Sequence, residues 1–138
     1  MPDASGSSVP RPGLVTTPLT QAYWQAASEG RLLLQRCLDC GQAQHYPRSL
    51  CAKCWSRQVE SFDGSGRGRI VTFTDITMPG HPAWLEEAPY TIAIIELEEG
   101  PRLLARVDPP TAVTVGDLVR LANPDRDGIH RFEVIREG

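Results

Sequence analysis

The chain has 138 residues, of which 41% are hydrophobic, and a formal net charge of −3. This length allows one domain, or a small module beside one compact core, and no run approaches the roughly 20 apolar residues of a membrane span. Residues 31–69 hold seven basic and three acidic side chains, whereas residues 70–138 hold six and twelve. The acidic second half argues against a general nucleic-acid surface there, and the weakly basic first part suits an anionic ligand or an acidic partner.

The N-terminal region divides into a tail and a helix. Residues 1–16 are rich in Ser, Pro and Gly and predict a disordered tail. Thr17-Pro18 then predicts a helix start with Thr17 as its N-cap, and Gly30 predicts its end, so the helix spans residues 17–30. Its Tyr23 and Trp24 give this short helix a large apolar surface. Either both rings pack on the rest of the chain, or part of this face binds a partner protein.

The four cysteines form two CxxC pairs with ten residues between them, Cys37/Cys40 and Cys51/Cys54. Two such turns predict one closed tetrahedral site, with a structural Zn²⁺ as the expected metal and iron as the alternative for the same ligands. Two disulfides are a further alternative. The start of the chain lacks the pattern of a secretory leader, which favours a cytoplasmic location and reduced thiols.

The residues that follow each cysteine pair differ. Gly41 follows Cys40 and can adopt the positive φ that a tight turn often needs, whereas Trp55 follows Cys54 and predicts a less ideal turn. Short strands are expected at residues 32–37, 43–46 and 58–62, which makes residues 31–63 a zinc ribbon whose stability depends largely on the metal. His45 is interpreted as a surface residue, or as one beside the ligands that does not bind the metal.

The remainder, residues 64–138, predicts a β-barrel. Gly64, Gly66 and Gly68 indicate a flexible boundary turn. Alternating patterns and turn residues then predict five short antiparallel strands and a small closed barrel of the OB type. The expected strands are residues 69–77, 90–98, 102–107, 118–121 and 130–136. The predicted fold is therefore mainly β: a short N-terminal helix, a four-cysteine zinc ribbon and a five-stranded OB-fold barrel.

A long loop, residues 78–89, interrupts this strand pattern. It carries His81 and Trp84 on a proline-stiffened frame and leads into Tyr90. Loops of this length are usually functional or disordered, and Trp is enriched at protein interfaces. The loop is therefore a candidate partner contact, and the alternative is that Trp84 folds back onto the barrel.

In this order and spacing, the motifs resemble those of an acyl-CoA-associated family with an N-terminal helix, a rubredoxin-like zinc ribbon and a C-terminal OB-fold. The resemblance covers about residues 21–132, and one departure is Trp55, where Gly is usual. The matching residues are Tyr23-Trp24, Glu29-Gly30-Arg31-Leu32, Gln35-Arg36-Cys37, Cys40-Gly41, Tyr46-Pro47-Arg48, Cys51, Cys54, Gly66-Arg67-Gly68, Pro89-Tyr90 and Glu99-Gly100-Pro101-Arg102-Leu103-Leu104-Ala105.

The resemblance implies a non-catalytic accessory subunit of a thiolase-fold enzyme. Such complexes perform thiolytic or aldol carbon–carbon cleavage or condensation on acyl-CoA thioesters, in lipid or aromatic degradation. Because thiolase-fold enzymes are dimers, the expected complex is a heterotetramer with two copies of each chain. The small subunit is expected to border the CoA or acyl channel, where Arg67 and Arg69 are candidate contacts to CoA phosphates. The alternative for both arginines is that they are solvated charges.

The residues by themselves agree that catalysis is not expected from this chain alone. The three histidines, His45, His81 and His130, are scattered over the predicted elements, and every cysteine is assigned to the metal. A single-stranded nucleic-acid-binding protein is the alternative, because OB barrels often bind nucleic acids through aromatic side chains and basic grooves. The central strands predicted here are aliphatic and partly acidic, so the prediction favours the accessory subunit.

Overall fold

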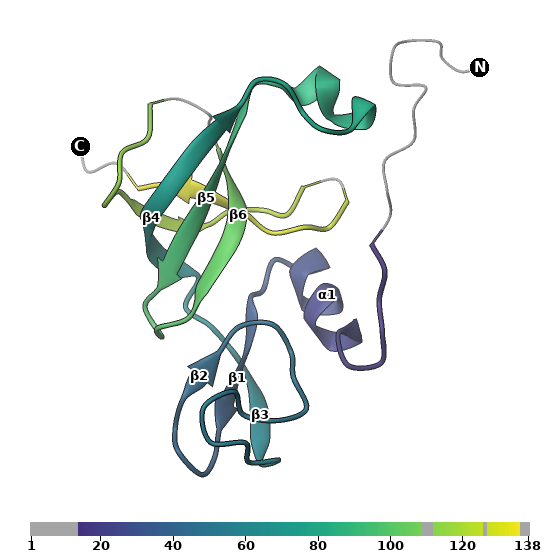
Figure 1. Cartoon of the computed structure of the whole chain (residues 1–138), viewed down its shortest axis with the longest axis vertical. Coiled ribbons are helices and arrows are strands. Elements are labelled where there is room, and N and C mark those ends of the chain that lie inside the picture. The colour runs from purple at the N-terminus through teal and green to yellow at the C-terminus, as the bar shows by residue number, and fades with distance from the viewer. Residues whose placement is uncertain (1–13, 109–111, 126, 136–138) are drawn as a thin grey trace.

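The computed structural model describes residues 14–108, 112–125 and 127–135, so most of the predicted tail, residues 1–13, lies outside the described part. A helix and a three-stranded sheet precede a five-stranded barrel (Figure 1). The elements in chain order are α1 (Gln21–Ser28), β1 (Leu33–Cys37), β2 (Ala43–Gln44), β3 (Val59–Asp63), β4 (Arg67–Ile76), η2 (Pro82–Glu87), β5 (Tyr90–Leu97), β6 (Arg102–Asp108), β7 (Leu118–Leu121) and β8 (Arg131–Val134). The predicted mainly β fold is confirmed.

Helix α1 is shorter than predicted at its N-terminal end and stops where predicted. A turn closed by the N–H of Thr20 and the carbonyl of Thr17 precedes it, so the N-cap is Thr20 rather than Thr17. At the other end Gly30 has a φ of +81° and donates to Ala27 O, while Arg31 donates to Ala26 O. These two bonds form a Schellman motif, which needs a left-handed residue at the position of Gly30.

The ribbon is a three-stranded antiparallel sheet in the order β2-β1-β3. Its inner side does not form a separate core. Leu32 and Leu34 are 1% exposed and belong to the same hydrophobic cluster as Ile70, Val107 and Phe132 of the barrel. Because the ribbon buries its apolar face against the barrel, the two modules stabilise each other.

The barrel closes in the order β4-β5-β6-β8-β7. Two features differ from the predicted five short antiparallel strands. Strands β6 and β8 pair in parallel, and β4 and β5 contain 10 and 8 residues. Parallel pairing is not visible in the sequence because it is set by the direction in which the last strand returns to close the barrel. Strand β5 alternates between half-buried and buried positions along its length, as expected for a sheet with one face on a core.

Gly68 lies in strand β4 and not in the flexible turn that the sequence predicted. A Cβ at this position would lie 2.5 Å from Glu96 O and 2.8 Å from Ile95 Cγ2. The strand therefore starts at Arg67, because only a residue without a side chain allows β5 to approach β4 this closely. The turn itself is limited to residues 64–66, where Gly66 has a φ of +79°.

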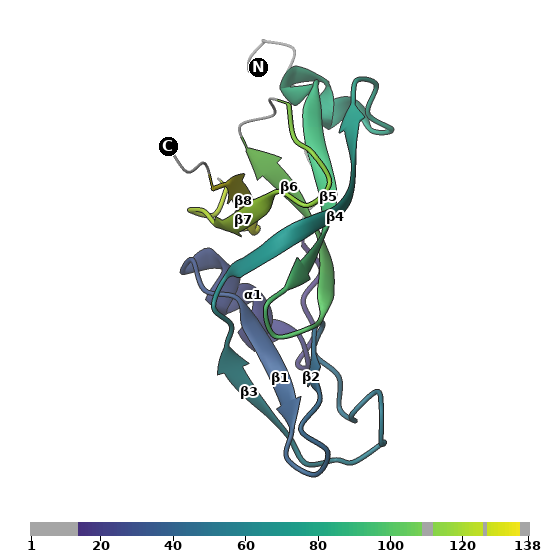
Figure 2. The ribbon, with the colours of Figure 1, turned by 90° about the vertical axis from the view of Figure 1, so that its left-hand side faces the viewer.

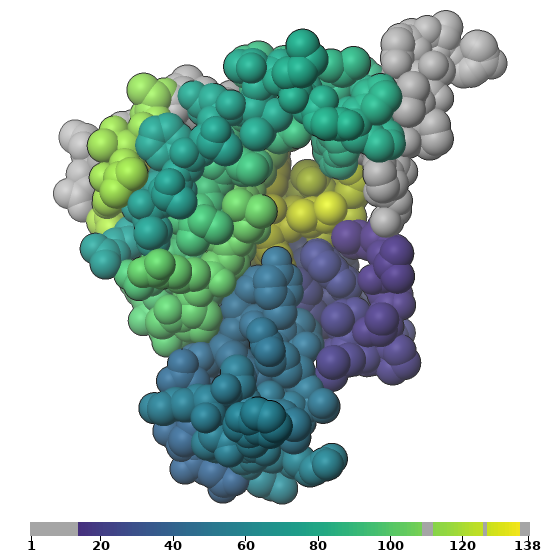
Figure 3. Space-filling model, in the orientation of Figure 1, coloured from purple at the N-terminus to yellow at the C-terminus, as the bar shows by residue number. Residues whose placement is uncertain are grey.

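The molecule is elongated, with the ribbon at one end and η2 at the other (Figures 1 and 2). Helix α1 lies beside the junction of ribbon and barrel, and the space-filling view shows the ribbon as a narrow lower end (Figure 3). Within the described residues, no helix has the length and apolar character needed to cross a membrane.

Candidate metal centre and surrounding surfaces

The first CxxC turn is a compact hydrogen-bonded knuckle at the end of β1. The N–H of Gly41 donates to Cys37 O at 2.9 Å, and the N–H of Cys40 points at Cys37 Sγ at 3.4 Å. Gly41 has a φ of +79°, as the sequence predicted. The N–H of Cys37 closes the unit by donating to Gln42 O.

The second knuckle repeats these bonds one for one. The N–H of Trp55 donates to Cys51 O at 2.9 Å, Cys54 N–H points at Cys51 Sγ at 3.5 Å, and Cys51 N–H donates to Ser56 O. Trp55 occupies the position of Gly41 and has a φ of +68°. The less ideal turn predicted at Trp55 therefore keeps the geometry of the first knuckle, and the bulky residue bears the strain of the left-handed conformation.

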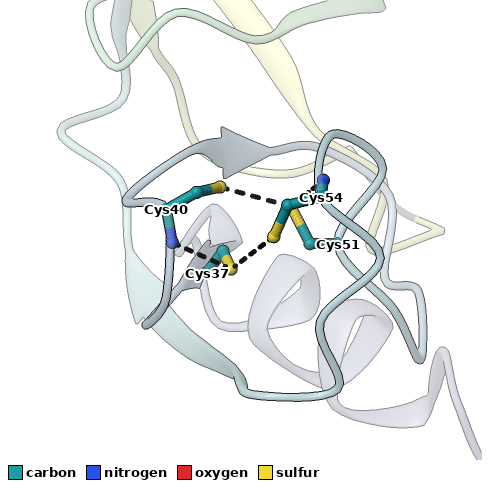
Figure 4. Close-up of side chains that lie close together, drawn as sticks. All are labelled: Cys37, Cys40, Cys51 and Cys54. Atoms are coloured by element: carbon teal, nitrogen blue, oxygen red, sulfur yellow. Dashed lines mark hydrogen bonds between the residues drawn. The ribbon is translucent and has the colours of Figure 1, made fainter.

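The two knuckles bring all four cysteine sulfurs within 4.8 Å of one another (Figure 4). The Sγ atoms of Cys37 and Cys54 are 3.5 Å apart, and those of Cys40 and Cys51 are 3.6 Å apart. A tetrahedral site with Zn–S bonds of about 2.3 Å requires sulfurs about 3.8 Å apart, so the geometry fits a four-thiolate metal. The backbone N–H groups of Cys54 and Lys53 outweigh burial and lower the pKa of Cys51 to about 6. The Ser56 N–H lowers the pKa of Cys54, but hydrogen bonding to Cys37 and the other sulfurs, together with burial, outweighs this effect and raises that pKa to about 12. A bound metal cation would favour the thiolate at all four positions.

A buried polar cluster joins the helix, the ribbon and the barrel. Tyr23 of α1 is 3% exposed, and its Oη lies 2.8 Å from His45 Nε2 and 3.4 Å from His130 Nδ1. His130 Nε2 lies 2.9 Å from Arg31 O and therefore carries the proton that this carbonyl accepts. We call Tyr23, His45 and His130 the junction cluster.

One arrangement of protons leaves no buried donor in the junction cluster without an acceptor. His45 Nε2–H donates to Tyr23 Oη, which donates to His130 Nδ1. His45 Nδ1, which is buried without a partner, is then a lone pair and not an unsatisfied N–H. Burial, followed by the nearby His130, lowers the pKa of His45 to about 4, and burial lowers the pKa of His130. Both imidazoles are therefore neutral at pH 7.

The junction cluster corrects two interpretations drawn from the sequence. His45 is 8% exposed and bonded to the helix, so it is not a surface residue, and its bond partner is a tyrosine and not a metal ligand. Tyr23 is held inside the chain, so its ring does not offer a partner a contact surface. Trp24 is half-buried and packs edge-on against Tyr23 with ring centroids 4.9 Å apart. Both rings thus pack on the chain, and a contact of the half-buried Trp24 with a partner stays a prediction.

The predicted contact loop contains the 3-10 helix η2. His81 caps this helix through its Nδ1, which accepts from Ala83 N–H at 3.0 Å, so its ring has a structural role there. Trp84 and Tyr90 line one cavity of about 270 Å³ together with Ile92, Leu104 and His130. The guanidinium of Arg106 stacks on the Tyr90 ring at 5.2 Å and pairs with Glu87 of η2. The structure thus brings Trp84 and Tyr90 together over an aliphatic strand face.

Arg67 and Arg69 also line a common cavity of about 290 Å³, which lies where the start of β4 meets the end of β5 and strand β7. The same cavity is lined by Glu96 and Glu98, and Arg69 pairs with Glu96 at 2.9 Å. Both arginines are exposed, but Arg69 is paired with a carboxylate and Arg67 forms no ion pair with a described residue. Two carboxylates beside two guanidinium groups make this a balanced surface and not a strongly cationic one.

Two features of these surfaces were missed by sequence reasoning. The junction cluster joins residues up to 107 positions apart, and no local pattern signals such a contact. Trp55 gave a signal, since a large residue stands where the matching knuckle has Gly, but it was interpreted only as a weaker turn.

The barrel, the ribbon and the four converging thiols together define a zinc-ribbon/OB-fold protein. Two family models match the chain: the ChsH2 rubredoxin-like zinc ribbon domain over residues 24–60 and the ChsH2 C-terminal OB-fold domain over residues 63–123. The chain belongs to this ChsH2 (DUF35) family, as the resemblance in its motifs predicted.

Known relatives agree with this assignment. A solved chain from the "Ltp2-ChsH2(DUF35) aldolase" is similar over 90% of this chain and 98% of its own, with 29% identity and a TM-score of 0.74. The benzoylsuccinyl-CoA thiolase subunit BbsA of Thauera aromatica is 30% identical over 76% of each chain. A probable enoyl-CoA hydratase alpha subunit of Thermomonospora curvata is 36% identical over 62% of this chain, but the match spans only 27% of that relative's length.

Proposed function

We propose that this chain is a non-catalytic accessory subunit that binds a thiolase-fold enzyme acting on acyl-CoA thioesters. The enzyme would perform thiolytic or aldol carbon–carbon cleavage or condensation, in the breakdown of lipids or aromatic compounds. The observation that carries the proposal is the near full-length similarity to the chain of the Ltp2-ChsH2(DUF35) aldolase. The similarity to a chain named as a thiolase subunit supports the same class of partner.

The metal centre supports a structural role for the ribbon. Zn²⁺ is the proposed ion, with one per chain, and when bound it would cross-link the two knuckles. Four thiolates fill a tetrahedral shell and leave no position for a substrate or a water molecule. Cys37, Cys40, Cys51 and Cys54 would all be engaged, so none is available as a nucleophile. Catalytic groups would then come from the partner.

The Trp84–Tyr90 cavity is the proposed docking surface on the barrel. Its floor is formed by outward-facing aliphatic residues of β5 and β6, including Ile92 and Leu104, and Leu104 is 54% exposed. Trp and Tyr are frequent energetic centres of protein interfaces because they bury a large area with little entropy loss. An apolar side chain of the partner would fill the cavity, and the Arg106–Glu87 pair would lie at its edge.

The same strands argue for a protein partner over a single-stranded nucleic acid. Bases stack on aromatic side chains placed on the central strands of an OB barrel. Here the outward positions of β5 after Tyr90 are Ile92, Ile94 and Glu96. A contact between Arg67 and a CoA phosphate is a further part of the proposal, because Arg67 is the exposed arginine of its cavity that has no ion pair with a described residue.

Co-expression with a thiolase-fold protein tests the proposal. Size-exclusion chromatography with light scattering should give a complex with two copies of each chain, and only the complex should turn over an acyl-CoA substrate. Trp84→Ala should weaken the complex by about tenfold or more, as expected for a buried interface tryptophan. Met78→Ala, which removes a 79% exposed apolar side chain near the start of the same loop, is the matched control. A chain that never associates, or that is active alone, would overturn the proposal.

A further inference from the structure

Trp55 is a bulky residue in a position that is unfavourable both for its backbone and for its apolar ring. Its φ of +68° lies in the left-handed region that disfavours side chains with a Cβ, and its ring is 76% exposed to water. The knuckle uses only its N–H, which donates to Cys51 O, and Gly41 supplies the same bond in the other knuckle. The metal site therefore does not require the indole ring.

Trp55 lines a cavity, and three basic residues lie close to it in the sequence. Trp55 lines a cavity of about 280 Å³ together with Arg48, Leu50 and Ala52. Three basic side chains near Trp55 in the sequence form no ion pair with any residue that the structure describes: Arg48, Lys53 and Arg57. Most barrel arginines differ in this respect, since Arg69, Arg102, Arg106, Arg120 and Arg131 are each paired with a carboxylate.

We propose that the second knuckle is a docking surface for an acidic patch, with an apolar side chain at its centre, on the thiolase-fold partner. This inference rests on the proposed function and adds a second surface at the end of the molecule opposite η2 (Figure 1). The apolar side chain would enter the cavity beside the indole ring, and carboxylates would pair with Arg48, Lys53 and Arg57. Trp and Arg are the residues most enriched at the energetic centres of interfaces.

A nucleic acid fits these observations less well. A protein that binds nucleic acid neutralises many phosphates at once. The second knuckle offers three cations, and they lie beside a site that carries about −2 when four thiolates hold one Zn²⁺. The cavity lined by Leu50 and Ala52 also favours an apolar group over a sugar-phosphate chain.

The decisive variant is Trp55→Gly, because the proposal predicts effects of opposite sign on folding and on binding. In the isolated zinc-loaded chain, glycine relieves the left-handed strain, so the melting temperature should stay the same or rise. In the complex, the dissociation constant should rise at least tenfold, as for other central interface tryptophans. Val115→Ala, which removes a 60% exposed apolar side chain before strand β7, should leave the dissociation constant within twofold.

Charge reversal tests the acidic character of the partner surface. Lys53→Glu and Arg57→Glu should slow association at low salt, and the difference from the unmodified chain should shrink as salt screens the charges. Arg102→Glu, the same charge change on the barrel, should have no such effect.

Each outcome decides the inference. If the complex forms and Trp55→Gly leaves its affinity within twofold, the docking surface is refuted while the proposed function stands. If Trp55→Gly lowers the melting temperature of the isolated chain, the ring has an internal role, and the inference is also overturned. Binding of a 20-residue oligo-dT that is lost in Trp55→Gly, with the complex unaffected, would assign the surface to nucleic acid. If no complex forms, the inference falls together with the proposed function.

Discussion

Tyr23→Phe should destabilise the fold far more than the loss of one oxygen atom suggests. The hydroxyl is the acceptor for the buried His45 Nε2–H at 2.8 Å and the donor to His130 Nδ1 at 3.4 Å. Its removal leaves the buried N–H of His45 with no acceptor, because the other nitrogen of that ring has no partner either. In Tyr23→Phe the desolvation penalty of this buried N–H is therefore no longer offset by a hydrogen bond.

The size of the effect follows from these contacts. A buried donor without its acceptor costs about 1–3 kcal/mol, and the long bond to His130 adds up to about 1 kcal/mol. We therefore expect a loss of about 2–3 kcal/mol in the free energy of unfolding. For a chain of this length, that corresponds to a fall of about 6–12 °C in the melting temperature.

Urea and thermal unfolding at pH 7.5, with excess zinc, measure this loss. Tyr46→Phe is the matched control, because Tyr46 is 52% exposed, and it should change the free energy of unfolding by less than about 0.5 kcal/mol. In Tyr23→Phe/His45→Leu the unpaired donor is also gone, so the double variant should lose less than the two single changes added together. Equal effects of Tyr23→Phe and Tyr46→Phe would refute the junction cluster as a source of stability.

Three further predictions follow from the metal centre, the junction cluster and the barrel. Chelation or Cys40→Ser should remove one equivalent of zinc per chain, as mass spectrometry would report. Hydrogen exchange should show that amide protection is abolished in the ribbon and lowered in the barrel, because both modules share one core; an unchanged ribbon would contradict a structural metal. The pKa of His45 falls from an unfolded value near 6.5 to about 4 in the fold, so the unfolded state binds more protons between these two pH values. Up to about 3 kcal/mol of stability should therefore be lost as the pH falls through this window. His45→Asn should flatten this pH dependence of stability, and His81→Asn should not. Gly68→Ala should cost at least about 3 kcal/mol in chemical unfolding, because its Cβ would lie 2.5 Å from Glu96 O, whereas Gly80→Ala meets no atom within 4 Å and should be nearly neutral; similar values for both would show that β4 and β5 can move apart at no cost.

The sequence predicted most of what is local. Two CxxC turns predicted the four cysteines whose sulfurs converge, Gly30 predicted the end of α1, and the alternating pattern of β5 predicted a strand with one buried face. Each of these features depends on residues a few positions apart, so the spacing in the chain is enough to specify it. The resemblance of the motifs to a family was likewise carried by residues in a fixed order, and the family models confirm it.

The predictions that failed depend on contacts between distant segments. Gly68 was interpreted as part of a flexible turn, because the need for a missing side chain arises only when β5 lies against β4. The parallel pairing of β6 and β8 was missed for a related reason. It depends on how the last strand enters the barrel, and a strand pattern carries no information on the direction of its neighbour.

The sequence alone thus determined the modules of this protein: a short helix, a four-cysteine ribbon and a barrel. The tertiary structure decided how they are joined and which aromatic residues remain outside. Tyr23 became the buried centre of the junction cluster because α1 packs where ribbon and barrel meet, while Trp55 stayed exposed because the knuckle uses only its backbone. Burial is a property of the assembled elements, so two aromatic residues of similar character in the sequence took opposite roles in the structure.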